Sequence, residues 1–388
     1  MIRFENKKII IATHVYATGP SHDVRDYLLE RGVESLLFIS HPLFFDQRLS
    51  ASGFELYKGG KSIRAHQSRI KRIPTVLSYG KDVFLNIIWS VRGGRDWDLY
   101  IGTDNLNALA GIILKWFGRV RKVVYYVIDY NPKRFQNRVF NRIYHWIDQF
   151  CVRHADETWN LSPRMEEARK EYFGFSGGRQ TVVPIGIWFD RFQRLDFSQI
   201  NKQTLVFMGH ILKKQGIQYV LEAIPLIIGA IPRFRFLVIG GGTYLKELKE
   251  QSAQLKIDDH VEFTGYIEDH KDVEAMLVRA GVAVAFYEKY DEHHNLSFTY
   301  FADPGKLKSY LAAGLPILTT NVSYNAREIE EKRCGRVVES SKESIAQAVI
   351  ALMQDEHALQ AYRENAIRYA QGFNWPNILD GVFKNSLS

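Results

Sequence analysis

The chain contains two successive series of short apolar segments, with helix-like segments between them. In the first series the apolar runs show little alternation with polar residues, and helices are expected near 21–31, 105–117, 133–154 and 163–173. Strands that are apolar on both faces are typical of parallel sheets covered by helices on both sides. The runs are KKIIIA (7–12), SLLFIS (35–40), DLYIG (98–102), KVVYYVI (122–128), ETWNLS (157–162) and TVVPIG (181–186).

A second series follows the polar, patternless residues 188–203 and has the same character. Its runs are TLVFMG (204–209), FRFLVIG (234–240), HVEFTG (260–265), VAVAFY (282–287) and PILTT (316–320). A chain of 388 residues is also too long to fold around a single hydrophobic core of ordinary size, so two domains are expected. We therefore expect an α/β protein with two Rossmann-like doubly wound domains. The expected parts are an N-terminal domain over 1–187, a linker over 188–203, a C-terminal domain over 204–370 and a C-terminal helix over 371–388 that packs back across the domain junction.

In doubly wound domains, ligands bind at the carboxyl ends of the strands, so we expect the two sheets to face each other across a cleft. The segment DPGKLKSYLAAGLPILTT (303–320) predicts a helix that begins at one such edge. Asp303 is an N-cap residue type, Pro304 suits the first helical position and Gly314 terminates the helix. Lys306 then lies in the first helical turn, where an anion is favoured.

Three further loops follow strands of the second series. The loop MGHILKKQG (208–216) contains Gly209, which permits close backbone approach, and the lysines Lys213 and Lys214. This combination suits the binding of a diphosphate. Lysines in a loop are also commonly solvated without binding a ligand. IGGGTY (239–244), with Gly241, fits either ligand contact or a tight packing turn, and it lacks the last glycine of a dinucleotide fingerprint. In FTGYIED (263–269), Tyr266 is a candidate contact for a nucleoside base.

The first series contributes candidates for the acceptor side. Asp129 follows the run 122–128, where its carboxylate fits either a cleft position or the N-cap of the next helix. His14 and Gly19 belong to the first loop. DEHHN (291–295) lacks the spacing of a metal site, so we expect a polar loop there and no bound metal or cofactor.

The net charge of +8 leaves anionic partners open. Residues 58–72 contain six cations and no acid, and Phe84, Trp89 and Trp97 follow, so region 58–97 fits either an anionic membrane surface or a solvated part of the first domain. Paired α/β halves argue against a nucleic-acid partner. Two distant cysteines, an N-terminus that predicts a first strand and the lack of a long apolar run predict a cytoplasmic protein, with peripheral contact at the inner membrane face left open.

Taken together, these segments resemble the GT-B glycosyltransferases of the large retaining family 4, or group 1, type. The resemblance covers both halves and is strongest over 204–340. It rests on VFMGHILKKQGIQYVLEAI, FRFLVIGGG, VEFTGYI, the PxK…YLAAGLPIL segment and REIEEKRCGRVVE, and in the first half on DETWNLSPRM and VVPIGIWFDRF.

The resemblance implies a nucleotide-sugar donor held by the second domain and an acceptor (a glycan, a lipid-linked sugar or a small molecule) held by the first. Lys306 matches the family's phosphate-binding lysine, and Tyr266 lies in the segment that contacts the base. Asp129 falls where many members carry a histidine near the reacting sugar. The implied activity is transfer of the sugar with retention of configuration, as in polysaccharide or glycoconjugate biosynthesis.

Four positions depart from the family pattern. His210 replaces the usual arginine and Gln215 the usual lysine, so Lys213 or Lys214 must substitute for the latter. Phe301 and Ser309 occupy the positions of the usual paired glutamates, and Ser309 retains only a hydroxyl for the ribose. A non-catalytic sugar-nucleotide-binding subunit and a sugar-nucleotide epimerase therefore stand as alternatives.

Overall fold

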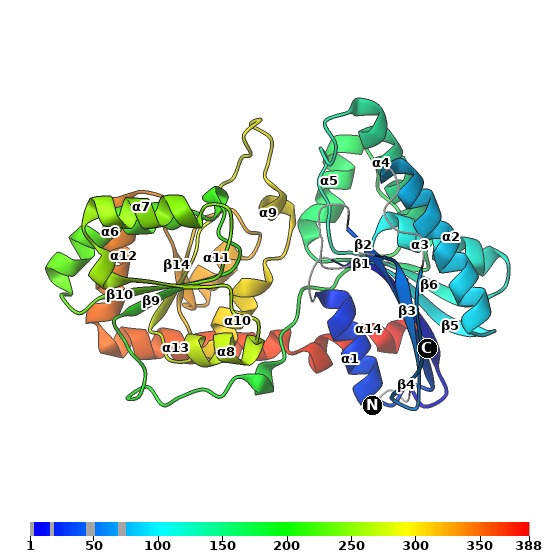
Figure 1. The fold of residues 1–388 in the computed structure, drawn as a ribbon, viewed down its shortest axis with the longest axis horizontal. Helices are drawn as coiled ribbons and strands as arrows, with labels where there is room; N and C mark the ends of the chain where they lie inside the picture. The colour runs from blue at the N-terminus through cyan, green and yellow to red at the C-terminus, as the bar shows by residue number, and fades with distance from the viewer. Residues whose placement is uncertain (1–3, 16–18, 44–50, 69–74, 388) are drawn as a thin grey trace. The chain divides into compact units, whose positions relative to one another are not determined.

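The computed structural model describes residues 4–15, 19–43, 51–68 and 75–387, and the chain divides into two compact units (Figure 1). Unit 1 comprises Met1–Pro184 and Trp375–Ser388, and unit 2 comprises Ile185–Asn374. Each unit is built on a largely parallel sheet with helices between successive strands. The expectation of an α/β chain with two Rossmann-like domains is confirmed.

Within the described residues, unit 1 contains an eight-stranded sheet in the order β4-β3-β2-β1-β5-β6-β7-β8. All pairs from β2 to β8 are parallel, and the order reverses between β1 and β5. The strands are β1 (Lys8–Val15), β2 (Ser35–Pro42), β3 (Gly53–Lys58), β4 (Lys61–Gln67), β5 (Trp97–Gly102), β6 (Val120–Val127), β7 (Glu157–Asn160) and β8 (Gln180–Val182). The helices are α1 (Pro20–Glu30), α2 (Thr75–Gly93), α3 (Asn105–Trp116), α4 (Arg138–His154), α5 (Pro163–Phe173) and α14 (Trp375–Ser386).

The antiparallel hairpin of β3 and β4 forms one edge of this sheet and was not expected from the sequence. Every residue of β4 is exposed, so its sequence lacks the apolar period that marks a strand. The hairpin carries part of the basic region 58–97, while Arg69, Lys71 and Arg72 lie outside the described residues.

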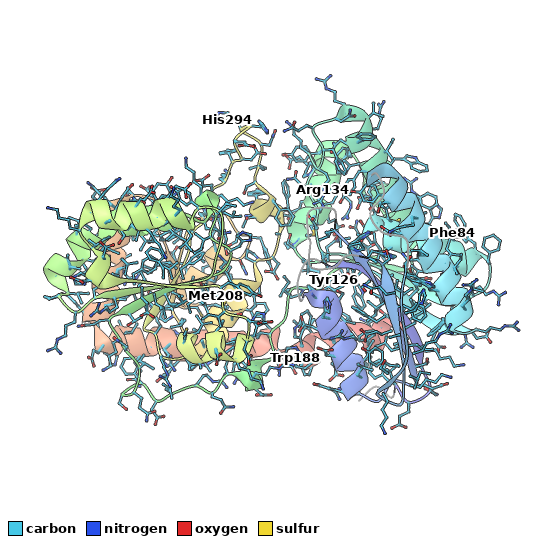
Figure 2. The ribbon with its side chains drawn as sticks, viewed as in Figure 1. Phe84, Tyr126, Arg134, Trp188, Met208 and His294 are labelled. Atoms are coloured by element: carbon cyan, nitrogen blue, oxygen red, sulfur yellow. The ribbon has the colours of Figure 1, made fainter. Side chains whose placement is uncertain are left out.

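The tryptophans of that region point into the unit. Trp89 and Trp97 are buried, whereas Phe84 is exposed and projects from α2 in Figure 2, and Tyr79 is 36% exposed. The region therefore lacks the row of exposed aromatic side chains that its sequence indicates. None of the helices in the described part of the chain is long and apolar enough to span a membrane.

Unit 2 contains, over its described residues, a six-stranded parallel sheet in the order β11-β10-β9-β12-β13-β14. Its strands are β9 (Thr204–Met208), β10 (Arg235–Ile239), β11 (Val261–Gly265), β12 (Val282–Ala285), β13 (Ile317–Thr319) and β14 (Gly335–Val337). The helices are α6 (Ile217–Ala230), α7 (Leu245–Leu255), α8 (His270–Leu277), α9 (Phe298–Phe301), α10 (Gly305–Ala313), α11 (Ala326–Glu331), α12 (Lys342–Gln354) and α13 (Glu356–Ala370).

Two apolar cores lie on the two faces of the unit 2 sheet. Leu205 and Phe207 of β9 belong to the core shared with α6 and α12, whereas Val206 between them belongs to the core shared with α8 and α10. This alternation follows from the two-residue period of a strand. In Figure 1 α6, α7 and α12 cover one face of the sheet, and α8, α10 and α13 the other. Both faces are covered, which explains the uninterrupted apolar runs.

The boundary expected at the linker differs from the observed one. Within 188–203, Phe189 and Phe192 are buried in the second core of unit 2, so this segment is an integral part of that unit. The C-terminal helix α14 belongs to unit 1, where Phe383 stacks on Tyr27 with ring centroids 5.9 Å apart. The apolar face of this helix is thus buried against the unit that begins the chain.

Candidate functional site

The candidate site lies at the carboxyl ends of β9 and β10, next to the point where the unit 2 strand order reverses. Two glycine turns approach each other here. Gly209 has φ +138 and Gly240 has φ +137, conformations that L side chains rarely adopt. The Gly209 N–H donates to the Ile239 carbonyl at 2.9 Å. A methyl group on Gly240 would overlap the carbonyl oxygen of Gly209, so only glycine lets the two turns pack.

Lys306 stands beside this glycine turn. Its Nζ donates to Oε1 of Gln215 at 2.7 Å, and a Cβ on Gly209 would lie 3.2 Å from the same Nζ. The ammonium also lies 4.4 Å from the centre of the Phe207 ring and 5.6 Å from that of Tyr287. Burial among these groups lowers the pKa of Lys306 to about 7. Lys306 is thus the second residue of α10, at a helix end that favours an anion.

Tyr310 fixes the helix against the strand that ends at the glycine turn. Its hydroxyl accepts the Met208 N–H at 2.6 Å, and its ring is buried one helical turn after Lys306. Met208 is the last residue of β9. The lysine and the turn are therefore positioned by one rigid contact between α10 and β9.

The expected N-cap role of Asp303 is wrong. Pro304 occupies the N-cap, α10 begins at Gly305, and no side chain caps the helix. The Asp303 carboxylate instead accepts the Ile185 N–H at 2.8 Å and forms a buried ion pair with Lys308. The buried Lys308 draws the carboxylate away from the first N–H groups of α10, because an unpaired charge is costly in an apolar interior.

The other predicted donor residues surround the glycine turns. His210, Lys213 and Lys214 are exposed, the two lysines in a 3-10 turn (Lys213–Gln215). The carbonyl of Gly241 accepts the Ile211 N–H at 2.9 Å. A Cβ atom added to Gly241 would lie 3.6 Å from Cβ of Tyr266, so the two residues are neighbours. Tyr266 is 74% exposed. The structure therefore brings the loops after β9, β10 and β11 together at one edge of the sheet.

Ser309 is half-buried on α10, and Phe301 is buried at the end of α9. These are the positions at which the sequence departs from the paired glutamates of the family. Sequence reasoning did not assign Phe207, Tyr287 or Tyr310 to the site. Their spacing marks them as core residues, and only the fold shows that they also enclose the lysine.

In unit 1, His14 lies at the carboxyl end of β1, beside the reversal point of that sheet. Its Nδ1 lies 2.6 Å from Oδ2 of Asp104 and its Nε2 lies 3.4 Å from Oδ2 of Asp82. Burial lowers the pKa of His14, but the two carboxylates outweigh this and raise it to about 10. Asp82 also accepts from Ser52 at 3.1 Å and lies 3.0 Å from Lys81. His14 is therefore a charged imidazolium inside a network of ion pairs.

The remaining candidates of unit 1 lie on other loops. Asp129 follows β6, is 37% exposed and forms an ion pair with Arg134. Gly19 is the N-cap of α1, and its carbonyl accepts the His22 N–H at 2.8 Å. In unit 2, Asp291 accepts backbone N–H groups of its own turn. Among the described residues no group of three or more His, Cys, Asp and Glu side chains is arranged to hold a metal ion.

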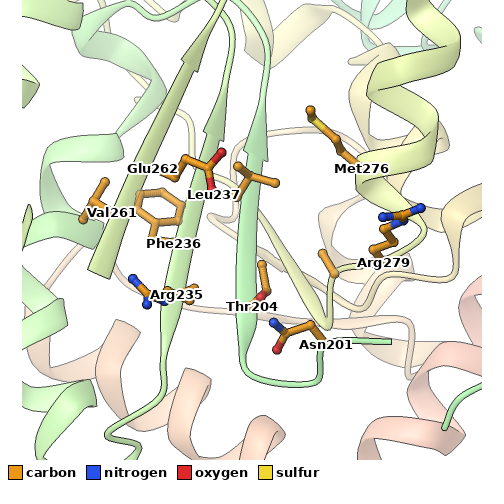
Figure 3. A pocket seen from close by; sticks show the side chains of 10 residues that line it. Asn201, Thr204, Arg235, Phe236, Leu237, Val261, Glu262, Met276 and Arg279 are labelled. Carbon is orange, nitrogen blue, oxygen red and sulfur yellow. The ribbon is translucent and has the colours of Figure 1, made fainter. Parts of the chain in front are cut away.

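A surface hollow of about 420 Å³ lies elsewhere in unit 2 (Figure 3). Thr204, Arg235 and Val261 line it, and these are the first residues of β9, β10 and β11. The hollow is therefore at the amino ends of the strands, on the opposite edge of the sheet from Lys306, and is not part of the candidate site.

Comparison with known proteins identifies the domain that carries this site. Residues 191–371 match the family model described as glycosyl transferases group 1. The poly(glycerol-phosphate) alpha-glucosyltransferase of Bacillus subtilis is 23% identical over 221 residues, which cover 55% of this chain and 30% of that protein. The curated relatives are each matched over less than half of their own length.

Solved structures match over nearly the whole chain. Sucrose-phosphate synthase from Thermosynechococcus elongatus has a TM-score of 0.71 at 16% identity and covers 98% of both chains. HepE of Anabaena, in complex with UDP and glucose, has a TM-score of 0.65 at 14% identity and covers 98% of this chain and 99% of that chain. Residues 191–371 are thus similar to the group 1 glycosyl transferases, and the two-unit fold of the whole chain is that of these solved GT-B structures.

Proposed function

We propose that this protein transfers a sugar from a nucleoside diphosphate sugar to an acceptor, with retention of configuration. The observation that carries the proposal is the placement of Lys306 at the start of α10, with its ammonium beside the Gly209 turn. A lysine, a helix N-terminus and a glycine turn together form a site for a diphosphate. The presence of UDP and glucose in HepE and the glucosyltransferase activity named for the Bacillus subtilis relative support this donor class.

In this mechanism the bond between the anomeric carbon and the diphosphate oxygen breaks, and its electron pair leaves with the diphosphate. Lys306, the α10 N-terminus and Lys213 or Lys214 stabilise the charge that develops there. The sugar becomes oxocarbenium-like, and the acceptor hydroxyl forms the new bond on the same face and gives its proton to the leaving diphosphate oxygen. The proposal uses no metal, because these cationic groups neutralise the leaving group.

We assign the acceptor to unit 1. Asp129 follows β6 and His14 lies at the carboxyl end of β1, at the edge where ligands of doubly wound sheets bind. Asp129 is partly exposed and held by Arg134, so it is suited to orient an acceptor hydroxyl or to stabilise the sugar cation. His14, with both ring nitrogens near carboxylates, is suited to fix the surrounding loops.

Mass spectrometry of the purified protein with a panel of nucleoside diphosphate sugars tests the proposal, with donor hydrolysis as the readout. Lys306→Ala should lower kcat/KM for the active donor by one or more decades, since a charge-assisted contact contributes roughly 2 kcal/mol. Lys246→Ala is the matched control, because that lysine is on the exposed face of α7. Equal turnover by the Lys306→Ala variant and the wild type would remove Lys306 from the mechanism.

A non-catalytic sugar-nucleotide-binding subunit is the second candidate function. The buried Phe301 favours it, because a phenyl ring cannot bond to sugar hydroxyls as a glutamate does. Calorimetric donor binding without hydrolysis or transfer would select this function. Conversion of the donor sugar in the absence of an acceptor would instead select an epimerase.

A further inference from the structure

Helix α4 of unit 1 exposes a row of large apolar side chains. Val139 and Trp146 are 64% and 66% exposed, and Phe140 and Ile143 are each 48% exposed. Val139, Ile143 and Trp146 recur at the spacing of one helix face. Monomeric proteins rarely leave so many large apolar groups together in water, so this face is a candidate contact surface.

The apolar face continues onto the end of α3. The Trp146 ring stacks on Phe150 with centroids 5.8 Å apart, and Phe150 meets Trp116 edge-on at 5.9 Å. Trp116 and the following Phe117 are 62% and 77% exposed. We name the six exposed residues the α3–α4 apolar surface: Trp116, Phe117, Val139, Phe140, Ile143 and Trp146.

The exposed charges on α4 itself have one sign, while at the end of α3 Lys115 is paired with Asp156 at 2.6 Å. Arg138, Arg142 and Arg153 are exposed on α4. The one acid of the helix, Asp148, is buried and bonded to Arg169 at 2.7 Å. The exposed face of α4 therefore presents apolar and cationic groups without a carboxylate, which is the composition of a helix that lies in a membrane interface.

We propose that the α3–α4 apolar surface binds the surface of a lipid bilayer that contains anionic lipid, with α4 lying in the plane of the interface. Tryptophan favours the boundary between acyl chains and headgroups, and arginines beside it attract anionic headgroups. A protein partner would more commonly be bound in a shaped groove and would offer carboxylates to the arginines. This face is instead an exposed helix with arginines along its margin. The proposal does not depend on the donor site, and it replaces region 58–97 as the membrane contact.

Flotation of the purified full chain with vesicles tests this proposal. The vesicles contain phosphatidylcholine alone or phosphatidylcholine with an equal amount of phosphatidylglycerol. Wild type should float with the anionic vesicles. The double variant Ile143→Ser/Trp146→Ser should bind at least roughly tenfold more weakly, because apolar burial in the interface is lost. Arg138→Gln/Arg142→Gln should weaken binding by roughly fivefold or more, with an effect that salt removes.

Leu226→Ser on α6 is the matched control, since Leu226 is a 47% exposed apolar residue of unit 2. It should bind the anionic vesicles like wild type. Trp116 and Trp146 should also be quenched by brominated lipid, whereas the largely buried Trp89, Trp97 and Trp159 should not.

Three results would overturn the proposal. One is equal flotation of wild type and the Ile143→Ser/Trp146→Ser variant. Another is loss of binding in Phe84→Ser with retention in Ile143→Ser/Trp146→Ser, which would return the contact to α2. The third is a concentration-dependent dimer in the ultracentrifuge that Trp146→Ser makes monomeric, with no binding of vesicles by wild type.

Discussion

Binding of a nucleoside diphosphate sugar should take up a proton at mildly alkaline pH, because Lys306 is partly neutral in the free protein. Burial lowers the pKa of this lysine to about 7. At about pH 8 only about one molecule in ten then carries the ammonium. A bound diphosphate supplies the counter-charge that the site lacks, and the lysine regains its proton.

The size of the uptake follows from the geometry. Each phosphate charge at about 4 Å from Nζ contributes about 4 kcal/mol at an effective dielectric constant of about 20, which corresponds to about three pKa units. The pKa of the bound lysine then exceeds about 9, so the uptake is about 0.9 proton at about pH 8 and about 0.1 at about pH 6. Since binding takes up the proton, affinity should fall as pH rises above 7, by up to about tenfold per unit.

Calorimetric titration in buffers of different ionisation enthalpy measures the uptake as the slope of the observed heat. UDP-glucose and GDP-mannose are suitable probes, because their diphosphate is a diester with no group that titrates in this range. Lys306→Arg is the matched control, since a guanidinium keeps the charge at every pH used, and it should bind without proton uptake. No uptake by wild type at about pH 8, or undiminished uptake by Lys306→Met, would refute the reasoning.

Three predictions concern stability. Gly240→Ala should destabilise the protein by about 2–4 kcal/mol in thermal or urea unfolding, because its methyl group would overlap a backbone carbonyl. The control Gly229→Ala, on an open face of α6, should stabilise the protein by about 0.5–1 kcal/mol. Equal effects of the two substitutions would contradict the close packing of the glycine turns. Asp148→Asn should destabilise by about 3–5 kcal/mol, because it leaves Arg169 charged and buried without its partner, and an unchanged urea midpoint would contradict this. Lys306→Met should raise the free energy of unfolding below pH 7, where the wild-type protein must bury a charged lysine. The gain should shrink as pH rises from 7 toward the lysine's unfolded pKa of 10.5, because the pKa in the folded protein lies below the pKa in the unfolded chain. A gain that grows with pH would contradict this sign.

The sequence predicts central strands such as β5 and β12 because they are buried on both faces and therefore apolar. It also places Lys306 in a first helical turn, because the proline, the helical repeat and Gly314 are all local features. It does not predict the short strand β14 at the edge of the unit 2 sheet. The hairpin of β3 and β4 escapes such reasoning. The edge strand β4, whose residues are all exposed to water, needs no apolar pattern, and its pairing with β3 shows only in three dimensions.

Partners that are distant along the chain explain the other differences. Asp303 has the sequence of an N-cap, but a buried Lys308 competes for its carboxylate. Asp82 and Asp104 lie 68 and 90 residues from His14, so no spacing rule connects them. Gln215 meets Lys306 across 91 residues in the same way. Local sequence patterns thus predict helices, strands and single candidate site residues. The ion pairs and hydrogen bonds that set the charge of those residues depend on the topology of the fold.

The return of α14 to unit 1 determines the order in which the two units can be completed during synthesis. Unit 2 is one continuous segment, while unit 1 needs the last residues to cover its aromatic core, where Phe383 meets Phe4 and Trp159 and Asp380 bonds to Arg31 at 2.9 Å. During synthesis all residues of unit 2 are therefore added before the helix that completes the core of unit 1. Removal of the final helix should expose the N-terminal unit to proteolysis first, although the cut lies next to the other unit in sequence.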